Sequence, residues 1–185
     1  MNADTRNRIV ITAMELFWEK GFQSTSVADI LSRSQVHSGS LYHFFPGKQD
    51  VLAAVLEAYR DGIETWLLQP AWSGVDDPID RIFALLDAYR THLVTTDCTY
   101  GCPIGSLALE LHEPDPRIRE LLSVNFRQWV GAIESCLAAP QDILARMGEA
   151  GRDRVLARHS ADAEAGKLAR LFELAIAAER ARDRP

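Results

Sequence analysis

Residues 21–48 decide the fold, and they read GFQSTSVADILSRSQVHSGSLYHFFPGK. Ser26 is followed three residues later by Asp29, which is the spacing of a capping box at the start of a helix. A short helix is therefore expected over 26–34, and a second is expected over 37–44, where a Pro-Gly pair closes it. Two short helices joined by a tight turn are typical of a helix-turn-helix.

The two expected helices have separate apolar and polar faces. Their apolar residues can close over an amphipathic helix at 5–20, which Gly21 ends, to form a three-helix core. These apolar residues are Val27, Ile30, Leu31, Val36, Leu41 and Phe44. The outer face of the second short helix carries hydrogen-bonding groups and small residues, namely His37, Ser38, Gly39, Ser40, Tyr42 and His43. A phosphate group or a base edge could approach such a face closely.

The N-terminal third of the chain resembles the DNA-binding domain of the TetR/AcrR family of bacterial transcriptional regulators. The resemblance covers about residues 6–65, and its most specific part is the run Gly39-Ser40-Leu41-Tyr42-His43-Phe44-Phe45-Pro46-x-Lys48. It implies a homodimer whose third helices enter successive major grooves of a palindromic operator on double-stranded DNA. It also implies a helical C-terminal domain that binds a small molecule and forms the dimer.

The same resemblance assigns DNA contacts to ten residues. Phosphate contacts would come from Thr25, Ser26, Tyr42, His43 and Lys48. Base edges would face His37, Ser38 and Ser40, with Gly39 leaving room for close approach and Gln35 extending the contact surface. Because few Arg residues lie on this helix, much of the specificity would come through water and DNA shape.

Two positions depart from the family pattern. Gln35 stands where the family usually has Gly in the turn, which requires either a positive φ or a slightly altered turn. Gly47 stands where Ser or Thr usually caps the fourth helix, at a cost of about a few tenths of a kcal/mol. Neither departure removes the resemblance to the TetR/AcrR family.

Composition and charge exclude several classes of protein. Of the 185 residues 47% are hydrophobic and 25% charged, a globular balance that excludes wholesale disorder. The sequence shows no secretory signal and no apolar run of about 20 residues, and its three cysteines fit a reducing compartment, so a cytoplasmic protein that contacts no membrane is expected. Lys and Arg equal Asp and Glu over 1–50, at five each, whereas 51–139 holds six against thirteen. A polyanion contact therefore belongs near the N-terminus.

The rest of the chain also shows helical patterns, so the predicted fold is all-α. A helix-turn-helix domain is expected at 1–47 and a helical ligand-binding and dimerisation domain at 48–185. Helices are expected over 48–68, which connects the domains and is punctuated by Pro70 and Ser73-Gly74, and over 78–95, 103–112, 116–138 and 141–182, the last interrupted near Ser160. No segment alternates with the period of a strand.

Aromatic residues gather in the second half of the chain. They either fill a helical core or line a ligand cavity, as the family resemblance implies. The candidate cavity residues are Trp66, Phe83, Tyr89, His92, Cys102, Phe126 and Trp129. The segment 101–108 is similar to a stretch in one branch of these regulators. The excess of acidic residues would favour a cationic ligand, although a solvated face explains the charges equally well.

The expected helix at 116–138 and the final helix of the chain each have more apolar positions than one buried face requires. This excess predicts a dimer contact. The candidate interface residues are Leu122, Phe126, Val130, Ile133, Leu168, Leu171, Phe172 and Ala175. Residues 144–173 are similar instead to the closing helices of GT-B glycosyltransferases, so 140–185 is predicted to be atypical for the regulator family. A sugar-nucleotide enzyme is rejected because no parallel strands are expected.

The predicted function is that of a DNA-binding transcriptional regulator, a ligand-responsive repressor that acts as a homodimer on a palindromic operator. One alternative is a constitutive DNA-binding protein with a filled core and no ligand. A second alternative is an enzyme that uses the C-terminal cavity. The sequence indicates no catalytic set, no cofactor and no metal site.

Overall fold

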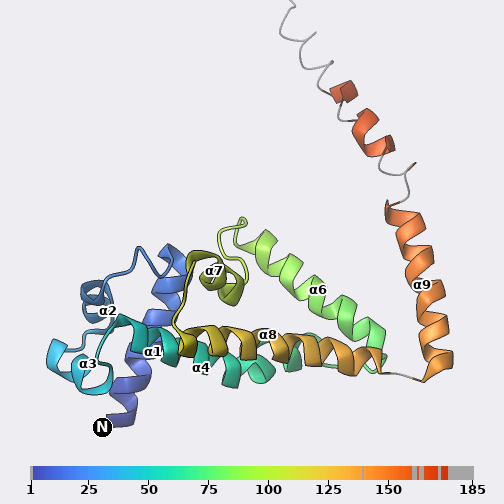
Figure 1. Ribbon diagram of the computed structural model, residues 1–185. Coiled ribbons are helices and arrows are strands. Elements are labelled where there is room, and N and C mark those ends of the chain that lie inside the picture. Colours follow the sequence, from blue (N-terminus) through green and yellow to red (C-terminus); the bar gives the residue numbers. More distant parts are fainter. Residues whose placement is uncertain (1, 139, 160–161, 163–164, 171, 175–185) are drawn as a thin grey trace, which may run out of the picture. The chain divides into compact units, whose positions relative to one another are not determined.

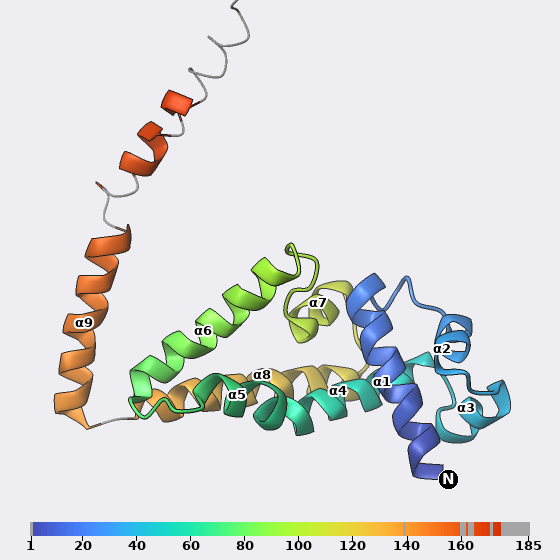
Figure 2. The ribbon, with the colours of Figure 1, turned by 180° about the vertical axis from the view of Figure 1, so that it is seen from behind.

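The computed structural model describes residues 2–138, 140–159, 162, 165–170 and 172–174 (Figures 1 and 2). The chain divides into two compact units, one ending at Leu137 and the other beginning at Ala138. Every regular element in the described residues is a helix, which confirms the all-α prediction.

The helix-turn-helix consists of α1 (Asn2–Lys20), α2 (Val27–Ser34) and α3 (Ser38–Phe44). Ser26 caps α2 as predicted, because its hydroxyl accepts the N–H of Asp29 while the Asp29 carboxylate accepts the N–H of Ser26. Gln35 ends α2 with a φ of 53° and a ψ of 39°, so the first of the two alternatives for this turn is confirmed.

The long helix that follows differs from its prediction. It comprises α4 (Lys48–Ile63), a wider π-helical turn at Glu64–Leu68 and α5 (Gln69–Trp72), so the chain stays helical past Pro70. The expectation that Pro70 punctuates the helix is therefore wrong. A proline in a regular α-helix clashes with the carbonyl four residues earlier, and a wider turn relieves such a clash.

The remaining helices of the first unit are α6 (Pro78–Thr95), α7 (Pro103–Glu110) and α8 (Pro116–Leu137). The expected ranges of α6 and α8 are confirmed to within one residue, and α7 ends two residues earlier than expected. Helices α4 and α8 run side by side, and α6 crosses over α8 (Figures 1 and 2). The short α7 lies against α1 and α8.

One hydrophobic core extends through most of the first unit. It joins fully buried residues of the helix-turn-helix, such as Ile9 and Leu41, to Leu56 of α4 and Ile118 of α8. The core therefore crosses residue 47, where the two domains were expected to meet, and the division there stays a prediction. A continuous core gives the helix-turn-helix a rigid attachment to the helices behind it.

The second unit contains α9 (Gln141–His159) and further helical residues at 165–170 and 172–174. The expected interruption near Ser160 lies outside the described residues. In the part of the chain that the structure describes, no helix combines the length and apolar character needed to cross a bilayer.

Candidate functional site

Helix α3 presents an open polar face to solvent. Leu41 is fully buried and holds the helix against the core, while the adjacent Tyr42 is 54% exposed. Most of the other residues expected to meet DNA are also exposed, namely Gln35, His37, Ser38, Gly39 and His43, with Ser40 half-buried. A Cβ added at Gly39 would meet no atom within 4 Å, so a partner could approach the backbone there.

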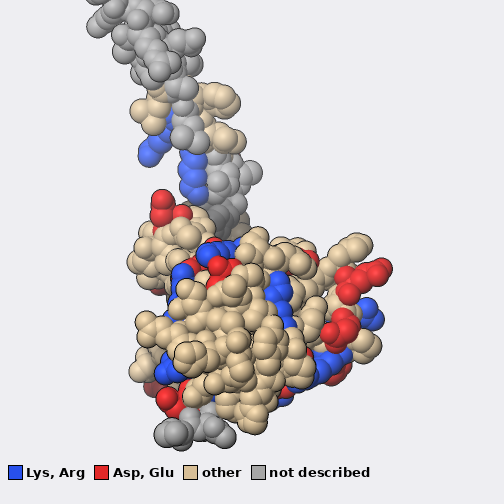
Figure 3. Space-filling view, turned by 90° about the vertical axis from the view of Figure 1, so that its left-hand side faces the viewer, with Lys and Arg blue, Asp and Glu red and all other residues tan. Residues whose placement is uncertain are grey.

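The surface around α2 and α3 carries few unpaired charges. Figure 3 views this end of the molecule and shows a largely uncharged area with Lys and Arg interspersed among Asp and Glu. Arg33 pairs with Glu19 at 2.7 Å, and Lys20 lies 3.9 Å from Asp29. Arg8 is exposed and forms no ion pair within the described residues. Long-range attraction to DNA is therefore weak on this face, and short-range contacts have to provide the affinity.

Two residues predicted to contact phosphate face inward instead. Thr25 is 1% exposed, and its hydroxyl donates to the carbonyl oxygen of Gly21 at 2.7 Å. The Lys48 ammonium donates to the carbonyl oxygens of Phe22 and Thr25, both at 2.9 Å, and lies 4.2 Å from the centre of the Phe22 ring. Desolvation lowers the pKa of Lys48, against the opposing effect of Glu110. Thr25 and Lys48 therefore have a structural role in the turn before α2, and the phosphate contacts expected of them stay a prediction.

The hydroxyl of Ser26 is also engaged within the chain. It donates to the Asp29 carboxylate at 2.7 Å and accepts the Asp29 N–H at 3.1 Å. These hydrogen bonds from Ser26 lower the pKa of Asp29, so this carboxylate stays ionised at the start of α2. A phosphate could reach the first N–H groups of α2, but the Ser26 hydroxyl has no free proton to offer it.

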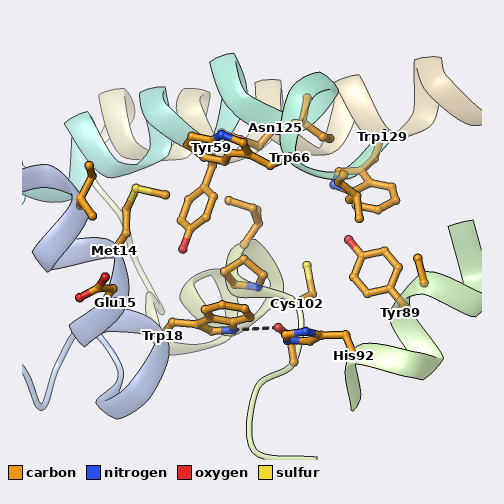
Figure 4. Close-up of a pocket in the computed structure, with 17 residues that line it drawn as sticks. Met14, Glu15, Trp18, Tyr59, Trp66, Tyr89, His92, Cys102, Asn125 and Trp129 are labelled. Atoms are coloured by element: carbon orange, nitrogen blue, oxygen red, sulfur yellow. Dashed lines mark hydrogen bonds between the residues drawn. The ribbon is translucent and has the colours of Figure 1, made fainter. Parts of the chain in front are cut away.

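A cavity of about 640 Å³ lies behind the helix-turn-helix, within the first unit. Its walls come from α1, α4 with its π-helical turn, α6, the segment before α7, and α8 (Figure 4). Five of the seven residues expected to line a cavity do so, namely Trp66, Tyr89, His92, Cys102 and Trp129. Phe83 and Phe126 lie outside it, and both are about 40% exposed.

The contribution of the N-terminal half of the chain to this cavity was not predicted from the sequence. Met14 and Trp18 of α1 and Tyr59 of α4 all line it. The helix at 5–20 was expected only to complete the three-helix core. The missed signal is the spacing of Met14 and Trp18, which are four residues apart and therefore share a second face of the same helix.

Aromatic pairs form two ends of the cavity (Figure 4). Trp18 stacks on His92 with ring centres 5.2 Å apart, and its indole N–H donates to the carbonyl oxygen of Gly101 at 2.9 Å. Tyr89 and Trp129 meet with centres 5.2 Å apart at an angle of 41°. Trp66 folds back over Gly62, where any side chain would collide with the indole ring.

The polar groups of the cavity are mostly neutral. Burial raises the pKa of both Tyr59 and Tyr89, with a smaller contribution from Cys102, so both phenols keep their protons. The Nε2 atom of His92 is buried and has no hydrogen-bond partner within the described residues.

Helix α7 joins the cavity to the helix-turn-helix. At its start, Cys102 lines the cavity and its sulfur accepts the N–H of Gly105 at 3.4 Å. At its end, the Glu110 carboxylate accepts the backbone N–H of Gln23 at 3.0 Å. Any side chain at Gly21 would overlap the Glu110 carboxylate, so the two segments are in close contact.

Family models match both halves of the chain. Residues 9–55 match the model described as bacterial regulatory proteins of the tetR family. Residues 78–177 match the C-terminal domain of LmrA/YxaF-like transcriptional regulators. The chain belongs to the TetR family. The second match includes residues 144–173, which were expected to be atypical for the family.

Individual relatives agree with this assignment. The chain is 32% identical over 62% of its length to the uncharacterised regulator Rv0196 of Mycobacterium tuberculosis, and spans 57% of that protein. It is 26% identical over 74% of its length to the transcriptional repressor DhaR of Mycobacterium sp., of which it covers 67%. The regulatory protein TetR from Rhodobacter sphaeroides superposes with a TM-score of 0.63 and 26% identity, covering 71% of this chain and 69% of that one.

The residues expected at a dimer interface have different surroundings in the structure. Leu122 is 7% exposed and belongs to the core of its own chain, so it is not free to meet a partner. Phe126 and Val130 on α8 are 42% and 55% exposed, and Ile133 is half-buried. Leu168 and Phe172 in the second unit are exposed as well. Leu171 and Ala175 lie outside the residues whose side chains are described.

Proposed function

We propose that this protein is a ligand-responsive transcriptional repressor that binds a palindromic operator as a homodimer in the bacterial cytoplasm. The observation that carries the proposal is the double role of α1. Leu16 and Phe17 of α1 are buried in the helix-turn-helix core, while Met14 and Trp18 of the same helix line the cavity. A molecule in the cavity would therefore touch the helix on which α2 and α3 are packed.

The DNA-binding side of the proposal rests on α3. Tyr42 and His43 would contact phosphates, and His37, Ser38 and Ser40 would face base edges, with Gly39 allowing the backbone to come close. None of these side chains forms the two-pronged contact that arginine makes with guanine. Operator selection would therefore depend on single hydrogen bonds, bridging water and DNA shape.

A dimer is needed because one short helix buries too little surface for tight specific binding. Two symmetry-related copies of α3 would read half-sites about 34 Å apart, which is one turn of DNA. The exposed residues Phe126 and Val130 offer an apolar face on α8 for this contact. Phe126 and Val130 come one and two turns after Leu122 of the core, and both are exposed where Leu122 is buried.

Control by a ligand requires that the ligand bind two states of the protein with different affinity. We place the coupling in α7 and α1, since both touch the cavity and the helix-turn-helix. Movement of Cys102 at one end of α7 would displace Glu110 from Gln23 at the other. The turn before α2 would shift with it, and the two copies of α3 would lose the spacing that the operator requires.

We choose repression over activation because the relative DhaR is named a transcriptional repressor. A cavity of about 640 Å³ is within the range of small-molecule sites, which favours ligand control over a constitutive DNA-binding protein. Within the described residues no group of three or more His, Cys, Asp or Glu is placed to hold a metal ion.

The experiment that tests this function measures DNA affinity with the cavity filled. The wild-type protein first selects a duplex from a random library, and the Kd for this duplex is then measured by fluorescence anisotropy with and without saturating Nile red, a neutral lipophilic dye. We expect the dye to raise the Kd several-fold in the wild type. We expect a smaller effect in Trp129→Leu, which alters the cavity wall, and the wild-type effect in Phe83→Leu, which changes an aromatic residue outside it. Bound dye that leaves the Kd unchanged would favour the constitutive DNA-binding protein.

A further inference from the structure

We infer that the ligand of this cavity is a flat aromatic molecule that carries a positive charge. The inference rests on the proposed function and specifies the chemical class of its ligand. It depends on three features of the cavity, namely the aromatic faces, the sign of the lining charges and the neutral polar atoms of the interior.

Aromatic faces make up much of the cavity wall. Trp18, Trp66 and Trp129 line it, and so do Tyr59 and Tyr89. The face of an aromatic ring carries partial negative charge and attracts a cation most strongly when water is excluded. The same faces offset-stack with a flat ligand. A flat cation gains from both interactions, whereas a flat neutral molecule gains only from stacking.

The charged groups that line the cavity also favour a cationic ligand. Glu15 of α1 carries the only carboxylate among the lining residues, and no Lys or Arg lines the cavity. Glu15 is exposed, so it lies where the cavity opens to solvent and forms no ion pair within the described part of the chain. An anionic ligand would lose its hydration and find no positive partner, which is costly. A cationic ligand would find Glu15 at the entrance and the aromatic faces inside.

The polar atoms of the interior can serve the nitrogen groups of such a ligand. The phenol oxygens of Tyr59 and Tyr89, which line the cavity, stay neutral and can accept an N–H from the ligand. An iminium or aromatic amine group therefore has acceptors and no competing cation beside it.

The test compares two dyes with the same three-ring skeleton and opposite charge. Rhodamine 6G is a cation and fluorescein is an anion at pH 8, and the Kd of each for the full chain is measured by fluorescence anisotropy without DNA. We expect rhodamine 6G to bind at least about tenfold more tightly than fluorescein. Equal affinities, or tighter binding of fluorescein, would overturn the inference.

Substitutions separate the cavity from the general negative charge of the surface. Glu15→Gln should weaken rhodamine 6G binding about three- to tenfold. Glu19→Gln removes the same charge from the same helix outside the cavity and should have no effect. Binding of the neutral dye Nile red should be equal in both variants and the wild type. Equal effects of the two substitutions on rhodamine 6G, or an equal loss of Nile red in Glu15→Gln, would contradict a charge-selective cavity.

The outcome for ligand class is distinguishable from the outcome for function. Tight rhodamine 6G binding that leaves the Kd for DNA unchanged supports the cationic ligand and contradicts ligand control. A neutral compound that fills the cavity and releases DNA, where rhodamine 6G does not bind, supports ligand control and contradicts the cationic ligand.

Discussion

The Glu110 carboxylate accepts a hydrogen bond from the backbone N–H of Gln23 at 3.0 Å, across 87 residues of sequence. This contact joins the end of α7 to the turn that precedes α2. The Lys48 ammonium holds the other side of the same turn through the carbonyl oxygens of Phe22 and Thr25. The turn is therefore held from two sides, by α7 and by α4, and both helices contribute residues to the cavity.

The first prediction concerns this contact. Glu110→Ala removes the acceptor for the Gln23 N–H and should cut the coupling between ligand and DNA at least about fivefold, or ~1 kcal/mol. Ligand affinity in the absence of DNA should stay at the wild-type value, because Glu110 does not line the cavity. The measurement is the ligand Kd with and without saturating duplex. Glu113→Ala, an exposed acidic residue in the next turn, is the matched control. If Glu110→Ala kept the wild-type coupling between ligand binding and DNA binding, the Glu110–Gln23 contact would not be the link between the two sites.

The second prediction compares two glycines. Gly21 has a φ of +84°, and a Cβ there would overlap Glu110, so Gly21→Ala should lower the free energy of unfolding by about 1–3 kcal/mol. Gly39 has open space around it within α3, so Gly39→Ala should be neutral or raise that energy by about 0.5–1 kcal/mol. Gly39→Ala should nevertheless weaken binding to DNA. Urea denaturation and anisotropy measure the two effects, and unimpaired DNA binding by Gly39→Ala would contradict a close approach at this position.

The third prediction concerns Lys48. Lys48→Met keeps the stem over the Phe22 ring but removes two hydrogen bonds from a charged donor, so the free energy of unfolding should fall by about 1–3 kcal/mol. Because the ammonium faces inward, the slope of log K for DNA against log salt should not change. A fall of about one in that slope would show that Lys48 contacts a phosphate after all.

The fourth prediction concerns the dimer. Val130 is 55% exposed on α8, so Val130→Glu should leave the fold intact and yield monomers in sedimentation velocity runs. These monomers should lose operator binding. Leu109→Glu changes a residue of α7 that is 90% exposed and should remain dimeric. A Val130→Glu protein that stays dimeric would exclude this face, and a wild type that sediments as a monomer at micromolar concentration would exclude the dimer.

Local signals in the sequence predicted the helix-turn-helix well. The spacing of Ser26 and Asp29 determines where α2 begins, and the hydrogen bonds that satisfy it are formed by neighbours in sequence. The positive φ at Gln35 also follows from a local requirement of the turn. Short-range rules suffice where the stabilising partners are three or four residues apart.

The site residues with partners far along the chain could not be placed in this way. Lys48 is a polar residue in a DNA-binding motif, and only the folded turn shows that its ammonium donates to the carbonyl oxygens of Phe22 and Thr25, which come 26 and 23 residues earlier. Leu122 and Phe126 are one turn apart on α8, and the burial of the first and the exposure of the second depend on where along the helix the packing against the core ends. The helical turn at Glu64–Leu68 was missed because it relieves a clash at Pro70 through wider geometry rather than by ending the helix.

The most direct test of the account is selection of DNA by the wild-type protein from a random duplex library, followed by sequencing of the bound fraction. The account predicts an inverted repeat whose half-sites lie about 10–10.5 base pairs apart, centre to centre. It also predicts that His37→Ala selects an altered half-site, whereas Tyr42→Phe selects the same repeat with lower affinity. Enrichment of no sequence, or of the same repeat with the same affinity by both variants, would contradict the claim that α3 reads an operator.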